Sequence, residues 1–567
     1  MSSLTAALQL GRSGLLASQT ALEVAGNNLA NMSTQGYHRQ TVQMVPASPQ
    51  EIQQGIYVGQ GVQVAGISRQ IDTALEARIN NSLANQASSA QQQQILNQIQ
   101  SLENELSNQD LSTQLTSFFN AFSNLANSPQ DTSLRGLVVQ QGVSLSSYLQ
   151  NLRSGLVDMR NQTDTTITQS TATANGLLTQ IAALNQQIVQ AGNGGSGAST
   201  LLDQRDNLIS QLSQYMSVSV NQQSNGSADV YVNSIPIVQG SQSRGVEIRQ
   251  TTQNGQPQVQ LVVSADGTVL NPQSGQIGAL IDSRNNDIVG DINTVDQFTN
   301  QLIYQVNRVH SQGQGTTGYS SVTGTTQVAD ATAALNSSAA GIPFTIQNGS
   351  FQVTVTQTST GQSQTYTVPV TLNGTGADMS LNDLVNSFNS TVSNATASVV
   401  NGQLQINTAG SDYQIGFGSD TSGALAALGL NTFFTGSNAV DVAVNADVAN
   451  NPALVAAGQN NQPGDNSNAL TLAQVGTQNV AALNNVSLTQ FWNNHVTTYA
   501  TRLGAVQQQA QADAAVTQSL QTQQQSVSGV NADEETINLL AYQRAYQASA
   551  RFLSVVDQMY QSLLQAV

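Results

Sequence analysis

The chain has 567 residues, only 8% of them charged, and its 32 acidic residues outnumber 15 Arg, with no Lys, to give a net charge of −17. This balance repels phosphate backbones and anionic lipid surfaces, so we expect no nucleic-acid partner and no membrane insertion. The absence of Cys excludes disulfides and thiol nucleophiles, and no apolar run is long enough for a membrane-spanning helix.

A chain of this length exceeds a single hydrophobic core, so we expect several domains. It begins with a predicted helix in which apolar residues recur every seven positions. One seam is Leu8, Leu15, Leu22 and Leu29, and the second, mostly small, is Leu4, Gly11, Ser18 and Ala25. Small residues let a partner helix approach closely. The simpler alternative is an amphipathic helix packed on its own domain. Because the helix lies at the start of the chain, we expect its partner to come from far along the sequence or from another chain.

The exit from this helix, residues 26–40, reads "GNNLANMSTQGYHRQ". Its Asn side chains can pair with backbone groups that a helix end leaves open. Asn31 and Gly36 suit left-handed backbone positions in the turn. Tyr37 and Arg39 are residue types favoured at interface hot spots. Taken alone, the stretch is also explained by an ordinary helix C-cap.

The next part of the chain is predominantly helical to about residue 213, and apolar alternation then predicts β-hairpins at about 216–272. The turn signals that separate these strands are Asn225-Gly226, Asn254-Gly255 and Asp266-Gly267. A helical pattern returns at about 275–312. We expect residues 71–319 and 466–524 to form a mainly helical middle domain.

The composition then changes, because the chain has no Lys or Arg between Arg308 and Arg502, and eight Asp without a Glu. Short alternating segments predict strands, and a short helix is expected near 381–392. The turn signals here are Asn348-Gly349, Thr360-Gly361 and Asn401-Gly402. We interpret residues 320–465 as an inserted β-rich, α+β domain.

The far end, residues 531–566, predicts a second long amphipathic helix. Asn531 followed by Glu534 resembles a capping box, and the acidic residues 533–535 suit the positive end of the helix dipole. Its heptad seam is Ala545, Phe552 and Met559, with Ala541, Ala548 and Val555 as the companion seam and Leu539, Leu553, Val556 and Leu563 widening the apolar face. Isolated short helices are marginal in water, so we expect both terminal helices to become firmly ordered on assembly.

These elements predict a mainly α fold with β-rich parts, arranged as an elongated, multi-domain hairpin. Residues 1–70 and 525–567 would form a terminal domain of paired, coiled-coil-like helices. The mostly helical middle domain with its β patch would follow, and the β-rich inserted domain would lie farthest from the termini.

The two ends together resemble the flagellar axial proteins, the family of rod, hook and hook-associated proteins. The matching N-terminal positions are Asn28, Leu29, Ala30, Asn31, Thr34, Gly36 and Tyr37, and the C-terminal ones are Glu534, Glu535, Leu539, Tyr542, Gln543, Tyr546 and Ala548. Within the family, "GYHRQ" with "LLDQRDNL" is similar to the hook-associated members at the junction between hook and filament. Rod and hook members more often have Phe-Lys after the turn, so another axial protein, of the hook or distal rod, is the alternative.

The resemblance implies a secreted structural protein of the bacterial flagellum that serves assembly and motility. It implies as partners further copies of the chain in a ring or helical array, the hook protein, a second hook-associated junction protein, the type III export apparatus and an export chaperone at the C-terminal helix. The absence of a secretory signal peptide is compatible with that export route. The residues we assign to the assembly interface are Leu8, Leu15, Leu22, Asn28, Leu29, Asn31, Thr34, Gly36, Tyr37, Arg39, Leu539, Tyr542, Arg544, Tyr546, Phe552, Met559 and Leu563.

We find no pattern typical of a catalytic, cofactor-binding or metal site. A phosphate loop needs a Lys, which the chain lacks. His38, His310 and His495 are far apart and not in a metal-ligand spacing. His310 lies near the end of its helix, where a positive charge is favourable, and Trp492 is expected in the core.

Asp203 and Asp206 are the nearest approach to a paired-carboxylate site. Residues three apart share a helix face, so we interpret them as a surface charge pair with Arg205. An enzyme such as a wall hydrolase would need a convergent acid–base pair, and we expect none. An adhesive role for the insert 320–465 is permitted by its polar β composition but is not indicated by it.

Overall fold

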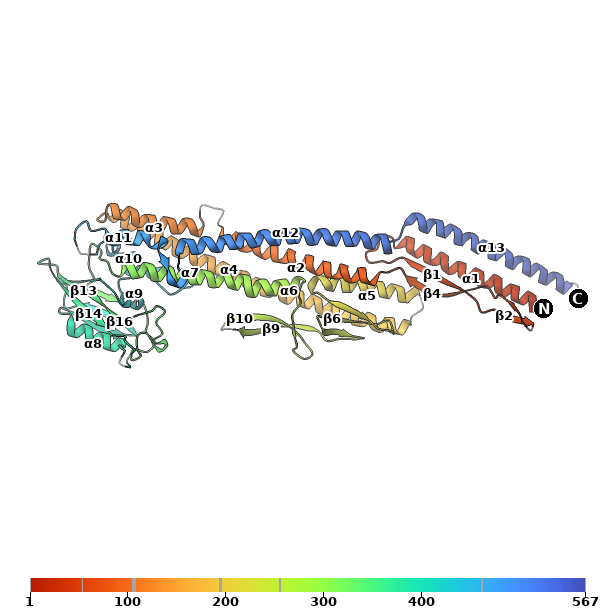
Figure 1. Cartoon of the computed structure of the whole chain (residues 1–567), viewed down its shortest axis with the longest axis horizontal. Helices are drawn as coiled ribbons and strands as arrows, with labels where there is room; N and C mark the ends of the chain where they lie inside the picture. Colours follow the sequence, from red (N-terminus) through yellow and green to blue (C-terminus); the bar gives the residue numbers. More distant parts are fainter. Residues whose placement is uncertain are drawn as a thin grey trace. The chain divides into compact units, whose positions relative to one another are not determined.

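The computed structural model describes residues 2–565 except 54, 105–108, 193–195, 254–255, 375, 377 and 460–461. It is mainly helical with several small antiparallel sheets (Figure 1), which confirms the predicted fold class. The predicted turn at Asn254-Gly255 lies outside the described residues. Within the part of the chain described, no helix has the length and hydropathy needed to cross a bilayer.

The chain divides into two compact units, each built from separate stretches of sequence. Unit 1 holds residues 1–95, 162–285 and 504–567, and unit 2 holds residues 96–161 and 286–503. Three long helices contribute residues to both units: α2 (Thr73–Glu103), α4 (Thr132–Ala191) and α12 (Leu488–Ser528). The three-part division expected from the sequence stays a prediction.

The terminal part of unit 1 contains α1 (Ser2–Ala30) and α13 (Ala532–Gln565), as predicted. Between α1 and α2 the chain forms two antiparallel hairpins, which the sequence analysis does not anticipate. The pairs are β1 (Gln40–Pro46) with β4 (Val62–Arg69), and β2 (Gln50–Gln53) with β3 (Ile56–Val58). Two of the missed strands, β1 and β3, are largely exposed and lack the alternating burial that marks a half-buried strand.

The rest of unit 1 packs two small sheets on helices α4, α5 (Ser196–Tyr215) and α6 (Gln276–Asp282). The first sheet has the order β5 (Ser219–Gln222), β6 (Ala228–Val232), β7 (Ile235–Gln239) and β8 (Gln242–Ser243). The second has the order β11 (Val269–Leu270), β10 (Gln256–Val263) and β9 (Val246–Gln253). Their shared core includes Leu178, Leu212, Val230, Leu261 and Ile277, all at most 2% exposed. The predicted β region at 216–272 is therefore confirmed.

Unit 2 has a helical part built from α3 (Leu111–Asn127), α7 (Val289–His310), α11 (Ser467–Gln474) and the adjoining segments of α2, α4 and α12. A π-helical turn, Ser283–Ile288, leads into α7, and the short strands β20 (Asn479–Val480) and β21 (Val486–Ser487) precede α12. Trp492 is fully buried with its ring 5.8 Å from that of Phe298, as expected for a core residue.

The β-rich part of unit 2 contains two three-stranded sheets and, where the sequence predicts a short helix near 381–392, the helix α8 (Leu381–Thr391). The sheets are β12 (Ser321–Thr323), β16 (Gln403–Thr408) and β15 (Ala395–Val400), and β14 (Gln362–Val370), β13 (Gly349–Gln357) and β17 (Tyr413–Gly418). The helix α8 starts with a capping box between Ser380 and Asp383. Short elements complete it: α9 (Ala424–Leu428), β18 (Phe434–Thr435), β19 (Ala443–Val444) and α10 (Ala446–Asn450).

The turn predictions in this part succeed where the backbone needs a positive φ. Asn401 and Gly402 both have positive φ angles, 51° and 76°, and join β15 to β16. Gly361 turns between β13 and β14 at a φ of 69°. The turn predicted at Asn348-Gly349 is wrong, because Gly349 begins β13 and pairs with Val370.

Candidate functional site

The two ends of the chain pack against each other as an antiparallel helix pair inside unit 1. A Cβ added at Gly11 would lie 2.8 Å from the Leu553 side chain, and one at Gly14 would lie 3.0 Å from the Ser549 hydroxyl. Figure 1 shows α1 and α13 side by side. Gly11 of the second predicted seam and Gly14, which lies outside both predicted seams, therefore form the contact, because small residues let the two backbones approach closely.

The stripe of α13 that faces α1 differs from the predicted one. The facing residues repeat at alternating intervals of three and four and are partly or fully buried: Leu539, Tyr542, Tyr546, Ser549, Leu553 and Val556. The predicted seams lie on the exposed side, where Phe552, Val555 and Met559 are 41%, 53% and 57% exposed. Phe552 still reaches α1, because a Cβ added at Gly11 would lie 3.0 Å from its ring. The role of these seam residues in assembly stays a prediction.

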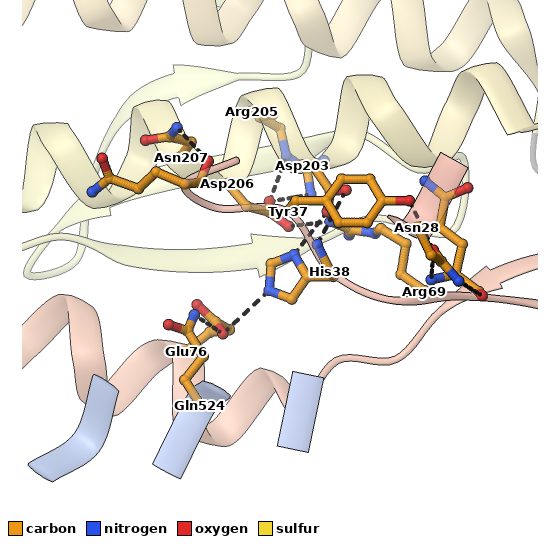
Figure 2. A network of polar contacts seen from close by, with 12 residues as sticks. Asn28, Tyr37, His38, Arg69, Glu76, Asp203, Arg205, Asp206, Asn207 and Gln524 are labelled. Carbon is orange, nitrogen blue, oxygen red and sulfur yellow. Dashed lines mark hydrogen bonds and ion pairs between the residues drawn. The ribbon is translucent and has the colours of Figure 1, made fainter. Parts of the chain in front are cut away.

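Asn28, in the last turn of α1, is the centre of a buried polar network at the base of this helix pair (Figure 2). It is 1% exposed. Its Nδ2 donates to the Gln40 carbonyl at 2.9 Å and to the Glu535 carboxylate at 3.1 Å. Its Oδ1 accepts from the Tyr37 hydroxyl at 2.8 Å and from the Gln40 amide at 3.0 Å. Both donors and both acceptor positions of the amide are used, which an Asp or a Leu of similar size would not allow.

Arg39 and Glu535 join the turn to the start of α13. Glu535 is 2% exposed, and its Oε1 accepts from Arg39 Nε at 2.7 Å. The Arg39 amide donates to the Ser528 carbonyl at 3.0 Å. A buried carboxylate is costly unless it is paired, and here both of its oxygens are. Asn531 caps α13 as predicted, accepting from the Asp533 amide at 3.0 Å.

Glu534 makes half of the expected capping box, because its amide donates to Asn531 Oδ1 at 3.4 Å. One of its carboxylate oxygens lies 3.4 Å from an Arg39 guanidinium nitrogen. The Glu534 side chain therefore faces the turn after α1.

His38 extends the network to the middle helices. Its Nδ1 lies 2.7 Å from Asp203 on α5, and its Nε2 lies 3.4 Å from Glu76 on α2. Burial alone lowers the pKa of His38, but hydrogen bonds and Coulombic attraction from Asp203 and Glu76 outweigh it and raise the pKa to about 9. The imidazole is therefore protonated at neutral pH and donates from both nitrogens. Gln524 on α12 also donates to Glu76, at 2.5 Å.

Asp203 and Asp206 form a buried ion-pair cluster with two arginines. Arg69, at the end of β4, donates to Asp203 at 2.7 Å and to Asp206 at 2.9 Å. Arg205 is fully buried and lies 2.9 Å from Asp206. The predicted surface charge pair is therefore wrong in its location, because Asp203 and Arg205 face the interior and Arg69 supplies the second cation.

The residues that the sequence analysis assigns to an assembly interface fall into three places. Asn28, Asn31, Thr34, Gly36, Tyr37 and Arg39 lie in the turn, where Asn31 Nδ2 donates to the Asn27 carbonyl at 3.0 Å and Gly36 has a φ of 77°. Asn31 itself does not adopt the expected left-handed backbone. Leu8, Leu15, Leu22, Leu29, Leu539, Tyr542 and Tyr546 are half-buried, whereas Arg544, Phe552, Met559 and Leu563 are exposed.

Apart from Arg39, the charged members of the network were not assigned to a site from the sequence. They come from five separate segments, so no local spacing connects His38, Arg69, Glu76, Asp203 and Glu535. The available signal was their rarity, because only 8% of the residues are charged. In such a chain each charge is more informative than usual.

The outer side of α13 carries an apolar face that nothing in the described structure covers. Of the described residues of α13, only Glu535 and Val556 are buried. The large apolar side chains exposed on α13 are Ile537 (67%), Leu540 (49%), Phe552, Val555, Met559, Tyr560 (37%), Leu563 (42%) and Leu564 (62%). Ile537, Val555 and Met559 lie on the side away from α1, and exposed apolar side chains gathered on one side of a helix mark an interaction surface.

His310 does not act as the positive charge expected at its helix end. Burial lowers its pKa to about 4, so the ring is neutral. Its Nδ1 lies 2.8 Å from the Asn431 carbonyl, and its Nε2 accepts from the Ala456 amide at 3.0 Å. It holds two backbone segments of unit 2 in place.

Three family models match this chain in different segments. The model described as "Flagellar hook-associated protein FlgK helical domain" matches residues 96–325. "Flagella basal body rod protein" matches residues 8–38, and "Flagellar basal body rod FlgEFG protein C-terminal" matches residues 521–566. The two terminal matches coincide with the helix pair and the turn.

Similarity to known proteins extends over nearly the whole chain. It is 28% identical to flagellar hook-associated protein 1 of Escherichia coli and 27% identical to that of Salmonella typhimurium, covering 97% of this chain and 98% of each relative. The solved structure of the flagellar hook junction protein FlgK from Burkholderia pseudomallei matches with a TM-score of 0.52 and 15% identity, over 80% of this chain and 100% of the solved one. At that identity the likeness concerns the fold.

Proposed function

Because the chain belongs to the flagellar hook-associated protein 1 family, we propose that it is a structural subunit at the junction between the hook and the filament of the bacterial flagellum. The observation that carries the proposal is the exposed apolar face of α13 beside α1. The terminal helices are paired within the chain, yet one side of the pair remains available to neighbouring subunits.

Assembly would bury this face against other copies of the chain and against adjoining flagellar proteins. Each Leu, Phe or Met removed from water contributes about 1.5–3 kcal/mol, so a few such side chains per subunit make a strong contact. The network around Asn28 and His38 would hold the pair at a defined angle to the middle helices. Heterologous contacts repeated from subunit to subunit then continue along the axis.

The partners follow from this position. We infer contacts with the hook protein on one side and a second hook-associated junction protein on the other. The chain would reach the extracellular flagellum through the type III export apparatus. An export chaperone would cover the exposed face of α13 before assembly, since an amphipathic helix with one free apolar face suits a helix-binding groove.

A structural role accounts for the polar site better than an enzymatic one. In the network around Asn28 and His38, each polar contact described joins one part of the chain to another. We therefore propose that the chain is not an enzyme. The alternative of a hook or distal rod protein is not favoured, because the whole-chain relatives and the helical-domain model are hook-associated.

The test is electron microscopy of cells that lack this chain, with an assay for flagellin in the medium. We expect hooks without filaments and flagellin lost to the medium. Cells without hooks would place the protein in the rod or hook instead, and normal filaments would contradict the proposal altogether.

A further inference from the structure

Three segments of unit 2 bring a histidine and two carboxylates together. Glu103 is the last residue of α2, Asp291 lies in the first turn of α7, and His495 lies on α12. One ligand atom from each lies within 4.8 Å of the others. His495 Nε2 is 2.8 Å from Glu103 Oε1 and 3.8 Å from Asp291 Oδ1.

The cluster is buried and carries an excess of negative charge. Glu103 and Asp291 are 3% and 6% exposed, and Asp287, one turn before Asp291, is 5% exposed. Arg502 pairs with Asp287. Three carboxylates face one guanidinium and one imidazole. The negative groups therefore outnumber the positive ones whether or not His495 is protonated, and the cluster attracts a divalent cation.

One oxygen of the cluster lacks a donor. Asp291 Oδ2 is buried and makes no hydrogen bond within the described part of the chain. A buried carboxylate oxygen without a donor is costly, and a cation bound beside Asp291 Oδ2 would remove that cost.

We infer that Glu103, Asp291 and His495 form a binding site for a divalent transition-metal ion of the Zn²⁺ type. An imidazole nitrogen with two carboxylates suits such an ion, whereas Mg²⁺ and Ca²⁺ prefer oxygen ligands alone. Zinc bonds of about 2.0–2.2 Å place neighbouring ligand atoms roughly 3.3 Å apart, so these side chains need only small movements. The ion would join α2, α7 and α12.

Two tyrosines tie the backbone of α2 near the site. The Tyr148 hydroxyl donates to the Glu103 carbonyl at 2.7 Å, and the Tyr499 hydroxyl donates to the Leu96 carbonyl at 2.8 Å. The π-helical turn Ser283–Ile288 directly precedes α7, and such turns occur frequently at functional sites.

Trp492 provides a built-in reporter for this site. It is the only Trp in the chain, and its ring centroid lies 5.0 Å from that of His495. The untagged full chain, freed of metal, should be titrated with Zn²⁺ and, separately, with Co²⁺ while Trp492 fluorescence is followed. We expect saturation at one ion per chain, quenching by Co²⁺, and one retained equivalent of metal after gel filtration.

Variants locate the site and separate binding from folding. His495→Gln and Asp291→Asn should each weaken Zn²⁺ binding at least tenfold. Metal-free Asp291→Asn should unfold at the same urea concentration as the wild type or a higher one, because it removes a buried carboxylate whose Oδ2 has no donor. His38→Gln, the same change in unit 1, should bind Zn²⁺ normally. If neither Zn²⁺ nor Co²⁺ binds at one ion per chain, the inference is wrong, and Glu103, Asp291 and His495 only share protons with one another. The inference would also be overturned if both site variants bound Zn²⁺ as tightly as the wild type. A preference of the wild type for Mg²⁺ or Ca²⁺ over Zn²⁺ would overturn it too.

Discussion

The side-chain amide of Asn28 donates to the carboxylate of Glu535 across 3.1 Å, although 507 residues separate them in the sequence. The contact joins the last turn of α1 to the first turn of α13. It makes the two ends of the chain one structural element, and the network around it connects that element to α2, α5 and α12. The predictions below test the network, the helix seam and the exposed face separately.

Replacing Asn28 by Ala should destabilise the terminal part of unit 1. The change leaves the Gln40 backbone, the Tyr37 hydroxyl and one Glu535 oxygen without a partner, at about 1–3 kcal/mol for each buried group left unpaired. Hydrogen exchange at the start of α13 should become faster, and the urea midpoint should fall. Asn81→Ala, at an exposed helical position, is the control and should leave both unchanged. If Asn28→Ala and Asn81→Ala had the same hydrogen-exchange rates and urea midpoints, the network around Asn28 would not stabilise this part of unit 1.

The stability of unit 1 should depend on pH through His38. Its pKa is raised from 6.5 to about 9 in the folded chain, so its contribution is fully present below pH 6.5 and is lost as the pH rises through about 9. Hydrogen exchange of unit 1 at pH 6, 7.5 and 9 would measure this loss. In His38→Gln the stability of unit 1 should change less between pH 6.5 and 9 than in the wild type. If the variant loses as much stability as the wild type over this pH range, another group causes the effect.

Two glycines of α1 should respond to Ala in opposite directions. Gly11→Ala places a Cβ 2.8 Å from the Leu553 side chain and should cost about 1–3 kcal/mol through overpacking of the helix seam. Gly26 has no atom within 4 Å of its Cβ position, so Gly26→Ala should stabilise the helix by about 0.5–1 kcal/mol. Urea unfolding of both variants gives the comparison. A stabilised Gly11→Ala would show that α13 does not pack here.

The exposed face of α13 should be needed for assembly but not for folding. Val555→Asp with Met559→Asp changes side chains that are 53% and 57% exposed, so circular dichroism and the unfolding midpoint should stay close to wild type. Cells carrying the pair should form hooks without filaments. The matched control is Val440→Asp, 57% exposed in unit 2, which should assemble normally. Filaments in the double variant would show that this face is not the interface.

Local pattern was sufficient for the elements at both ends. Seven-residue spacing predicted α1 and α13, and the small residues Gly11 and Ser18 marked the close-contact face of α1. The Asn- and Gly-rich turn was predicted, with Gly36 in a left-handed conformation. These features depend on short-range sterics and on helical periodicity, which neighbouring residues encode.

The tertiary structure decided which stripe of α13 is paired and which charges meet. Phe552 and Leu553 are adjacent in sequence and both fit a heptad, but the Leu553 stripe packs along α1 and the Phe552 stripe stays largely exposed. His38 gained two carboxylates and is protonated, whereas His310 is neutral because burial removes its ring from water. The pairing of Asn28 with Glu535, and of His495 with Glu103 and Asp291, joins distant segments. Such contacts depend on how helices pack, and the spacing of residues along one helix does not specify its partner.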